Sequence, residues 1–171
     1  AGILPTTGGL IVIEGNNFGS AIMNDFSLKM IPLPSPLLPD VITCTSHEHT
    51  RLVCPLPPGQ GTDYALSLLV GGQSPLSGTF KGIDYALPVV MAVTPENVTT
   101  FNPASITIRG RNFGVDQPIV ELQGTGQNCT ITSYSHTQIT CTVPNGQGKL
   151  HRVVVGAGGQ FSSSTCLAIF N

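Results

Sequence analysis

The pentapeptide Gly15–Gly19, with the sequence GNNFG, returns 95 positions later as GRNFG in Gly110–Gly114. Each copy follows a short alternating run of apolar and polar residues, Leu10–Glu14 in the first case and Ser105–Arg109 in the second. Alternation with a period of two is typical of a half-buried β-strand. The chain therefore contains the same strand and turn twice.

Three further segments repeat at a shorter offset of 87 positions. They are His49–Cys54 with His136–Cys141, Gly59–Gly61 with Gly146–Gly148, and Gly71–Gln73 with Gly158–Gln160. A period of about 90 residues is too long for a helical solenoid unit and suits a small globular domain. The 171 residues are therefore predicted to form two tandem domains, residues 1–86 and 87–171.

The amino-acid composition favours β-structure. Twenty glycines and fourteen prolines argue against long helices, and short β-branched runs bounded by turn residues recur along the chain, which is typical of a β-sandwich. The net charge of −2 provides no basic surface for nucleic acid. No apolar run approaches the roughly 20 residues that a membrane span needs.

The charge content is unusually low for a protein surface. Charged residues make up 9% of the chain, whereas about 25% is usual. Uncharged polar residues, attached sugars or burial against neighbouring molecules must therefore protect the surface from aggregation.

Four of the five cysteines occupy matched places in the two repeats. Cys44 and Cys54 are ten positions apart, and Cys129 and Cys141 are twelve apart. Two short strands joined by a turn would bring each pair together, so we predict two disulfides, although a metal site and free buried thiols are the alternatives. The absence of any C-x-x-C spacing disfavours zinc.

The fifth cysteine and two glycosylation sequons bear on the compartment. Asn97-Val98-Thr99 and Asn128-Cys129-Thr130 are acceptor triplets for N-linked sugar, and together with paired cysteines they favour an extracellular location. Cys166 has no counterpart, because Thr79 stands at the matching position. Cys166 is therefore either an unpaired or intermolecular thiol, or a small buried apolar residue.

The repeated motifs resemble the IPT/TIG domain, an immunoglobulin-like β-sandwich. The resemblance includes a Pro-bounded opening strand at Pro88–Pro95, the G-x-N-F-G turn, and a later stretch at Ser135–Pro144. It covers nearly all of the second repeat and the first repeat from about Gly8. The resemblance implies an all-β fold of two tandem immunoglobulin-like β-sandwiches.

Physical reasoning about the pentapeptide agrees with this resemblance. We expect its two terminal glycines to permit a turn with positive φ. Phe18 and Phe113 can plug the end of each sandwich, and Asn17 and Asn112 can bond local backbone.

The resemblance implies several functional classes. IPT/TIG repeats occur in cell-surface receptors, adhesins and fibrous surface proteins, in Rel-type transcription factors, and as accessory modules of carbohydrate-active enzymes. The acidic balance, the cysteine pairs and the sequons disfavour a transcription factor, and the absence of Trp disfavours a module that stacks on sugars.

No catalytic, metal or cofactor site stands out in the sequence. His47-Glu48-His49 resembles a metal-binding triplet, but His49 matches His136 inside a repeated structural motif that lacks the second histidine. No Asp/Glu pair stands at matched positions, and nothing marks a serine with a histidine and an acid. We therefore interpret the chain as non-enzymatic and expect no cofactor.

The first repeat carries about ten extra residues around positions 30–39. Four prolines in eight positions predict an extended arm that cannot join the middle of a sheet. The arm is either a decorated loop or a docking arm with O-linked sugar. The candidate acceptors are Pro32, Pro34, Ser35, Pro36 and Pro39.

The first repeat also lacks part of an opening strand. If copies of the chain were joined head to tail, the stretch from Cys166 to the next Gly15 would be about eleven residues shorter than Thr79–Gly110. Such a gap leaves an unpaired edge that another chain can fill.

These observations predict an extracellular, glycosylated structural protein whose copies assemble head to tail into a fibril. The expected apolar anchors are Ile3, Leu4, Leu167 and Ile169. The alternative is the ectodomain fragment of a cell-surface adhesin or receptor that binds a different protein.

Overall fold

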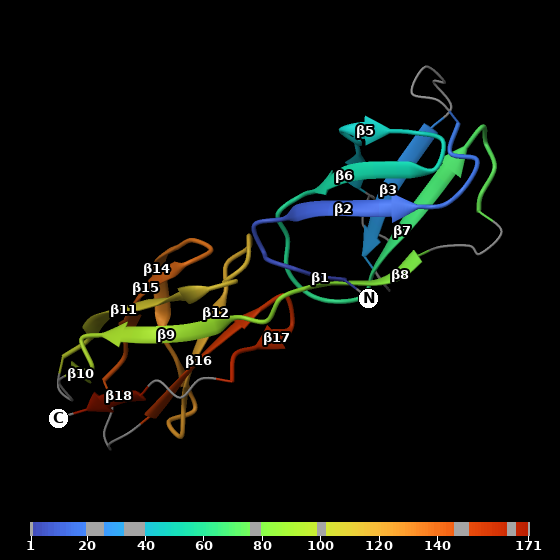
Figure 1. Cartoon of the computed structure of the whole chain (residues 1–171). Coiled ribbons are helices and arrows are strands. Elements are labelled where there is room, and N and C mark those ends of the chain that lie inside the picture. Colours follow the sequence, from blue (N-terminus) through green and yellow to red (C-terminus); the bar gives the residue numbers. More distant parts are fainter. Residues whose placement is uncertain are drawn as a thin grey trace. The chain divides into compact units, whose positions relative to one another are not determined.

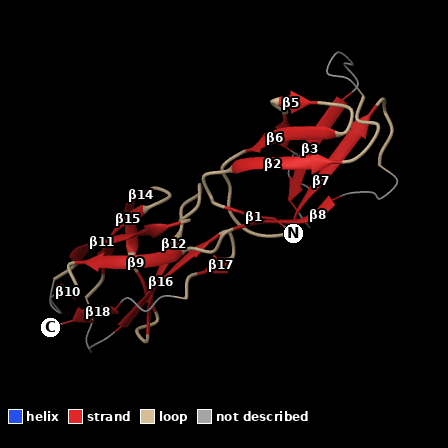
Figure 2. Ribbon diagram, viewed as in Figure 1, coloured by secondary structure: helices blue, strands red, loops and turns tan. Residues whose placement is uncertain are grey.

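The computed structural model of the chain describes residues 2–19, 26–32, 40–75, 80–98, 102–145, 151–163 and 167–170. All regular elements in these ranges are β-strands (Figure 2), and the prediction of an all-β protein is confirmed. No helix within the described ranges is long and apolar enough to cross a membrane. The chain forms two compact units, Ala1–Pro58 with Thr62–Tyr85, and Gly59–Gly61 with Ala86–Asn171.

The first unit contains a five-stranded sheet in the order β1-β8-β7-β3-β4 and a three-stranded sheet in the order β2-β6-β5 (Figure 1). β1 pairs with β8 in parallel, whereas the other pairs are antiparallel. The strands are β1 (Gly2–Leu4), β2 (Gly9–Glu14), β3 (Phe26–Pro32), β4 (Asp40–Ile42), β5 (Ser46–His47), β6 (Arg51–Leu56), β7 (Tyr64–Val70) and β8 (Phe80–Tyr85).

The second unit contains a sheet in the order β10-β18-β16-β12-β13, with β17 also pairing β16, and a sheet in the order β14-β15-β11-β9. Here β10 and β18 form the parallel pair. The strands are β9 (Val89–Thr94), β10 (Asn97–Val98), β11 (Ala104–Arg111), β12 (Ile119–Gln123), β13 (Gln127–Asn128), β14 (Thr130–Tyr134), β15 (Gln138–Val143), β16 (His151–Ala157), β17 (Gln160–Phe161) and β18 (Leu167–Phe170).

Alternation along equivalent strands builds the two cores. In β6 every second residue is buried, at Leu52, Cys54 and Leu56, and β15 repeats this pattern. Each core takes side chains from both sheets of its own unit, which is the packing of a β-sandwich. The largest fully buried side chains include Tyr85 and Leu28 in the first unit and Phe113 and Ile106 in the second.

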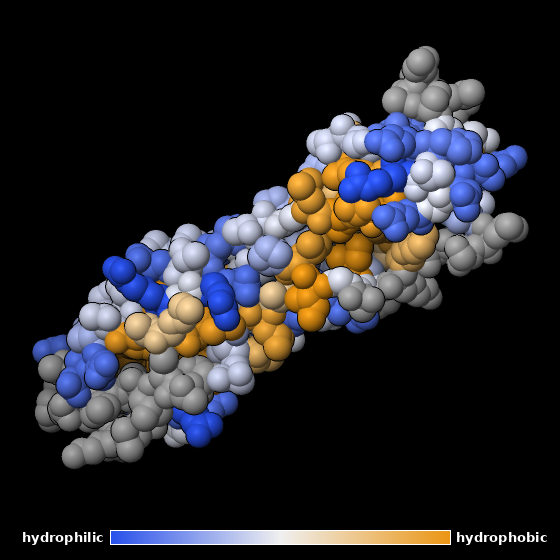
Figure 3. Space-filling view, in the orientation of Figure 1, coloured by the Kyte–Doolittle hydropathy of each residue, from blue (hydrophilic) through white to orange (hydrophobic). Residues whose placement is uncertain are grey.

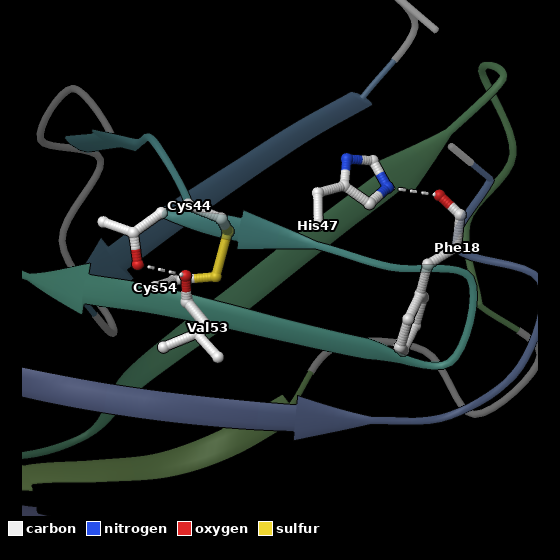
Figure 4. Close-up of a disulfide and its surroundings, with 6 residues drawn as sticks. Phe18, Cys44, His47, Val53 and Cys54 are labelled. Atoms are coloured by element: carbon white, nitrogen blue, oxygen red, sulfur yellow. Dashed lines mark hydrogen bonds between the residues drawn. A yellow bond between two sulfur atoms is a disulfide. The ribbon is translucent and has the colours of Figure 1, made fainter. Parts of the chain in front are cut away.

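A disulfide joins the predicted cysteines in each unit. The pairs are Cys44–Cys54, with a sequence separation of 10, and Cys129–Cys141, with a separation of 12. Figure 4 shows how the Cys44–Cys54 bond ties the segment before β5 to β6, where the Thr45 hydroxyl donates to the Val53 carbonyl at 3.2 Å. The Thr45 N–H donates to the same carbonyl at 2.8 Å. The predicted pairing within each repeat is therefore present.

The Pro-rich insertion, predicted at residues 30–39, begins after Pro32. Residues Met30–Pro32 belong to β3, which lies between β7 and β4, and Met30 is buried in the core. Pro32 pairs only with Tyr64 of β7, because the pairing with β4 ends at Met30. Its missing N–H is therefore not needed on the other side. Pro34, Ser35, Pro36 and Pro39 lie outside the described residues.

Removing either disulfide should destabilise only its own unit. Double Cys→Ala variants at 44/54 and at 129/141 should each lower the free energy of unfolding of the corresponding unit by about 3 kcal/mol, because a constraint on the unfolded chain is lost. Denaturant titration of both variants and of the parent chain measures this effect. An unchanged midpoint in both variants would contradict a structural role for these bonds.

Candidate functional site

The G-x-N-F-G turn is anchored in the same way in both units. The N–H groups of Gly15 and Phe18 donate to the carbonyls of Thr50 and His49, both at 3.0 Å. In the second unit, Gly110 and Phe113 donate to the matching Thr137 and His136 carbonyls at 2.9 and 3.1 Å. The repeated His-Thr pair therefore supplies backbone acceptors to the turn.

Packing explains why the first position of the turn is glycine. A Cβ at Gly15 would lie 2.6 Å from the Phe18 ring, and one at Gly110 would lie 2.6 Å from the Phe113 ring. Both rings are buried, as predicted for plugs of the sandwich ends.

The expectation of positive φ at both terminal glycines is only half right. Gly19 and Gly114 adopt positive φ, but within the motif the other positive values occur at Asn17 (66°) and Asn112 (61°) rather than at the first glycine. Asparagine tolerates this conformation better than most residues. The Asn112 side chain also donates to the carbonyl of Leu87, a residue 25 positions away, at 3.2 Å.

The histidines of the first unit have structural partners. His47 Nε2 lies 2.7 Å from the Phe18 carbonyl oxygen, and its ring packs on Phe26 at a centroid distance of 4.5 Å (Figure 4). The described part of the chain contains no group of three or more His, Cys, Asp or Glu side chains that could hold a metal ion. The His47-Glu48-His49 triplet thus helps to hold the turn against β5 and β6.

The two units differ at one sheet edge. In the second unit, β11 lies between β15 and β9. In the first unit, the equivalent strand β2 pairs with β6 on one side, and no strand of the described residues pairs with its other side. The chain turns directly from β1 into β2, where the Gly8 N–H donates to the Pro5 carbonyl at 2.9 Å. Within the described residues, β1 of the first unit thus corresponds to β10, and no strand lies beside β2 at the place that β9 takes beside β11.

The core next to this edge is less covered than its counterpart in the second unit. Ile13 and Phe18 retain 8% and 7% of their surface exposed, whereas the matching Ile108 and Phe113 retain 0%. Ile11 is only partly buried, whereas its counterpart is fully buried. On the β6 side, by contrast, Leu52 and its counterpart in β15 are equally buried. The strand that pairs with β2 on its other side thus keeps its cover.

The outward side chains at this edge are apolar where the second unit has polar ones. Leu10 (67% exposed) and Val12 (49%) match Ser105 and Thr107. Ile3 (73% exposed) matches Asn97. The next residue in each strand, Leu4 or Val98, is buried and pairs in parallel with the end of the last strand of its unit, β8 or β18. We call Ile3, Leu10 and Val12 the apolar corner.

Figure 3 shows apolar surface over β1 and β2 of the first unit. Clustered exposed apolar side chains commonly mark a contact surface. The open edge of β2 and the apolar corner together form the candidate functional site. A comparison of outward positions between the repeats could have found it in the sequence, because Leu10/Ser105 and Val12/Thr107 are visible once the two runs are aligned.

The four residues predicted as apolar anchors of the assembly differ in exposure and in their place in the sheets. Ile3 is exposed, but Leu4 is buried in the core of its own unit. Leu167 and Ile169 belong to β18, which lies between β16 and β10 and is not a sheet edge. Cys166 lies outside the described residues.

The two predicted N-glycosylation sites are in the second unit. Asn97, in β10, and Asn128, in β13, are both exposed residues. Sugar at either position can project into solvent without disturbing the core.

Comparison with known proteins identifies the second unit. Residues 88–169 match the family model described as IPT/TIG domain. No curated protein sequence matches the chain.

Several solved structures have a similar fold at low sequence identity. The surface glycan-binding protein PbSGBP-B from Prevotella bryantii has a TM-score of 0.54 at 15% identity, over 97% of this chain and 37% of that one. The plexin A4 extracellular region has a TM-score of 0.49 at 16% identity, over 99% of this chain and 15% of that one. A Bacteroides thetaiotaomicron protein of unknown function has a TM-score of 0.46 at 16% identity over 50% of this chain, which spans 22% of its length.

Exchange of Leu10 and Val12, two of the three residues of the apolar corner, for their counterparts in the second unit should reduce the exposed apolar surface without unfolding the domain. The variant Leu10→Ser/Val12→Thr should change the free energy of unfolding by no more than about 0.5 kcal/mol, since surface substitutions rarely do more. It should also bind less of an apolar fluorescent dye than the parent chain.

Val41→Thr is the matched control, because Val41 is 72% exposed on the other sheet of the same unit. A loss of stability well above 1 kcal/mol in the double variant would show that Leu10 and Val12 pack within their own unit.

Proposed function

Residues 88–169 match the IPT/TIG domain family, and on this premise we propose that the chain is a non-enzymatic extracellular structural protein whose copies assemble head to tail into a fibril. The observation that carries the proposal is the unpaired edge of β2 beside the apolar corner. A sheet edge of this kind pairs readily with another chain unless it is covered or charged. Glu14 is the only charged residue in β2.

Assembly along one direction follows from the difference between the units. The first unit presents an open edge, and the second unit has the same edge closed by β9. A contact between unlike ends of two copies is heterologous, and such contacts propagate as filaments unless they close into a ring. The low charge of the chain, with 9% charged residues, weakens repulsion between copies.

Disulfides and sequons support the extracellular part of the proposal. Two disulfides are typical of proteins that fold in an oxidising compartment. Sugar at Asn97 and Asn128, and on the Pro-rich segment at 32–39, would supply the solvation that charged side chains provide in most proteins. A fibril of glycosylated repeats thus accounts for both the low charge and the disulfides.

Native protein is expected to carry sugar at Asn97 or Asn128. Glycopeptide mass spectrometry of material from its source, with and without enzymatic removal of N-glycans, measures occupancy at each site. Asn102, which lies outside any sequon, is the internal control. Bare peptides at both sequons would contradict this part of the proposal.

Electron microscopy of native material tests the assembly itself. We expect filaments built from identical copies, with the first unit of one copy against the second unit of the next. Purified native protein that remains monomeric at high concentration and binds a different protein instead would favour the ectodomain of an adhesin or receptor.

A further inference from the structure

The sequon Asn128-Cys129-Thr130 contains a cysteine that the folded second unit uses in a disulfide. We propose that the two modifications occur in a fixed order, in which sugar is attached to Asn128 before Cys129 bonds to Cys141, and that the closed disulfide then blocks attachment. The inference rests on the proposed extracellular, glycosylated state of the chain and specifies how one of its sites is modified.

The sequon lies where the chain passes from one sheet of the second unit to the other. Asn128 ends β13, which pairs with β12 through Glu121. Thr130 begins β14, which belongs to the other sheet and pairs with β15 through Thr142. The triplet is therefore held in two sheets at once.

Cys129 fixes the middle of the triplet. Its N–H donates to the Val120 carbonyl at 2.8 Å, and its side chain keeps only 5% of its surface exposed. Its sulfur is bonded to Cys141 of β15, which is fully buried. The triplet is thus held by strand pairing, by this hydrogen bond and by the disulfide.

Exposure alone does not make the folded triplet a good acceptor. Asn128 and Thr130 are both exposed, so a sugar attached earlier can remain in solvent after folding. A transferase, however, must hold the triplet in its own groove, and freeing a segment that core strands hold costs up to the free energy of global unfolding. The folded unit therefore accommodates the product of glycosylation but resists the reaction.

Both steps use reagents of an oxidising secretory compartment. In the transfer, Asn128 Nδ2 forms a bond to the anomeric carbon of an oligosaccharide, the bond from that carbon to the pyrophosphate of a lipid carrier breaks, and the pyrophosphate leaves with the amide proton. In the second step, the two cysteine thiols exchange with the disulfide of an oxidoreductase, which takes up two electrons and two protons and becomes a dithiol.

Synthesis leaves a short interval for this order. Cys141 follows Cys129 by 12 positions, which corresponds to roughly one to two seconds at about 5–20 residues per second. Disulfide formation takes seconds to hours, so sugar can be attached first. The triplet that begins at Asn97 contains no cysteine and is under no such limit.

The first repeat provides a matched control. Thr43 stands before Cys44 at the place of Asn128, so the triplet Thr43-Cys44-Thr45 is not a sequon. The chain passes between sheets here as well, from β4 to β5, and Cys44 is bonded to Cys54. The substitution Thr43→Asn would place an acceptor under the same constraint in the other unit.

Purified chain tests the block directly. Protein made without sugar is offered to an oligosaccharyltransferase with a lipid-linked oligosaccharide, and glycopeptide mass spectrometry measures transfer at each site. Asn128 should accept sugar only after reduction or in the variant Cys141→Ala, which keeps the sequon intact. Cys54→Ala, which removes only the other disulfide, should accept no more at Asn128 than the oxidised parent chain.

The variant Thr43→Asn should reverse this dependence, because its new acceptor should be modified only when Cys54→Ala is added. Equal transfer to Asn128 in the oxidised parent chain and in Cys141→Ala would overturn the inference, as would no transfer to Asn128 in either.

Pulse labelling in an N-glycosylating secretory cell tests the order itself. Alkylation of free thiols at early times should reveal chains that carry sugar at Asn128 while Cys129 is still reduced. Chains that close the disulfide without sugar should remain without sugar during the chase. Sugar that appears only on chains already bonded at Cys129 would overturn the inference.

The outcomes separate this inference from the proposed function. Sugar that only chains lacking the Cys129–Cys141 bond can gain, together with native protein that forms no filaments, would support the order and reject the fibril. Native filaments from a chain that gains sugar at Asn128 after the bond has closed would overturn the order and leave the structural function standing.

Discussion

The packing of Phe18 and Phe113 over a glycine determines the shape of each sandwich end. Each ring occupies the space that a Cβ at Gly15 or Gly110 would need, so the strand can turn sharply and its amides can reach the His-Thr carbonyls. Those bonds join the first strand of the motif to the hairpin that carries the disulfide. Both units keep this arrangement, although they differ in the strands around it.

That difference leaves the first unit with a sheet edge that no described strand covers. A sandwich whose edge strand is covered, as β9 covers β11, presents few unpaired backbone groups. Without such cover, β2 exposes unpaired backbone groups and leaves Ile13 and Phe18 partly open to solvent. Its outward side chains are Leu10 and Val12, where the second unit has Ser105 and Thr107.

Much of this account could be predicted from the sequence. Repetition of G-x-N-F-G and of the cysteine spacing led to two β-sandwiches with one disulfide each, and counting between anchors indicated the β2 edge as a place where the units differ. Burial of Leu4 could not be foreseen, because it depends on the parallel pairing of β1 with β8. The prolines predict an extended arm from Met30 onward, but Met30–Pro32 belong to β3. Pro32 fits there because β4 pairs with β3 only as far as Met30, so one side of Pro32 has no neighbouring strand that needs its N–H. The grouping of Gly59–Gly61 with the second unit could not be predicted from the neighbouring sequence. It depends on the Gln60 side chain, which accepts hydrogen bonds from the backbone amides of Val115 and Asp116, more than 50 positions away.

The central claim is that the edge of β2 is open in the isolated chain and closed in the assembled state. Segment-resolved hydrogen exchange of dilute protein and of native assemblies compares β2 with β11 in one experiment. The account predicts that β2 exchanges much faster than β11 in dilute protein and slows to the rate of β11 in the assemblies. Equal protection of the two strands in dilute protein, or an unchanged rate for β2 after assembly, would contradict it.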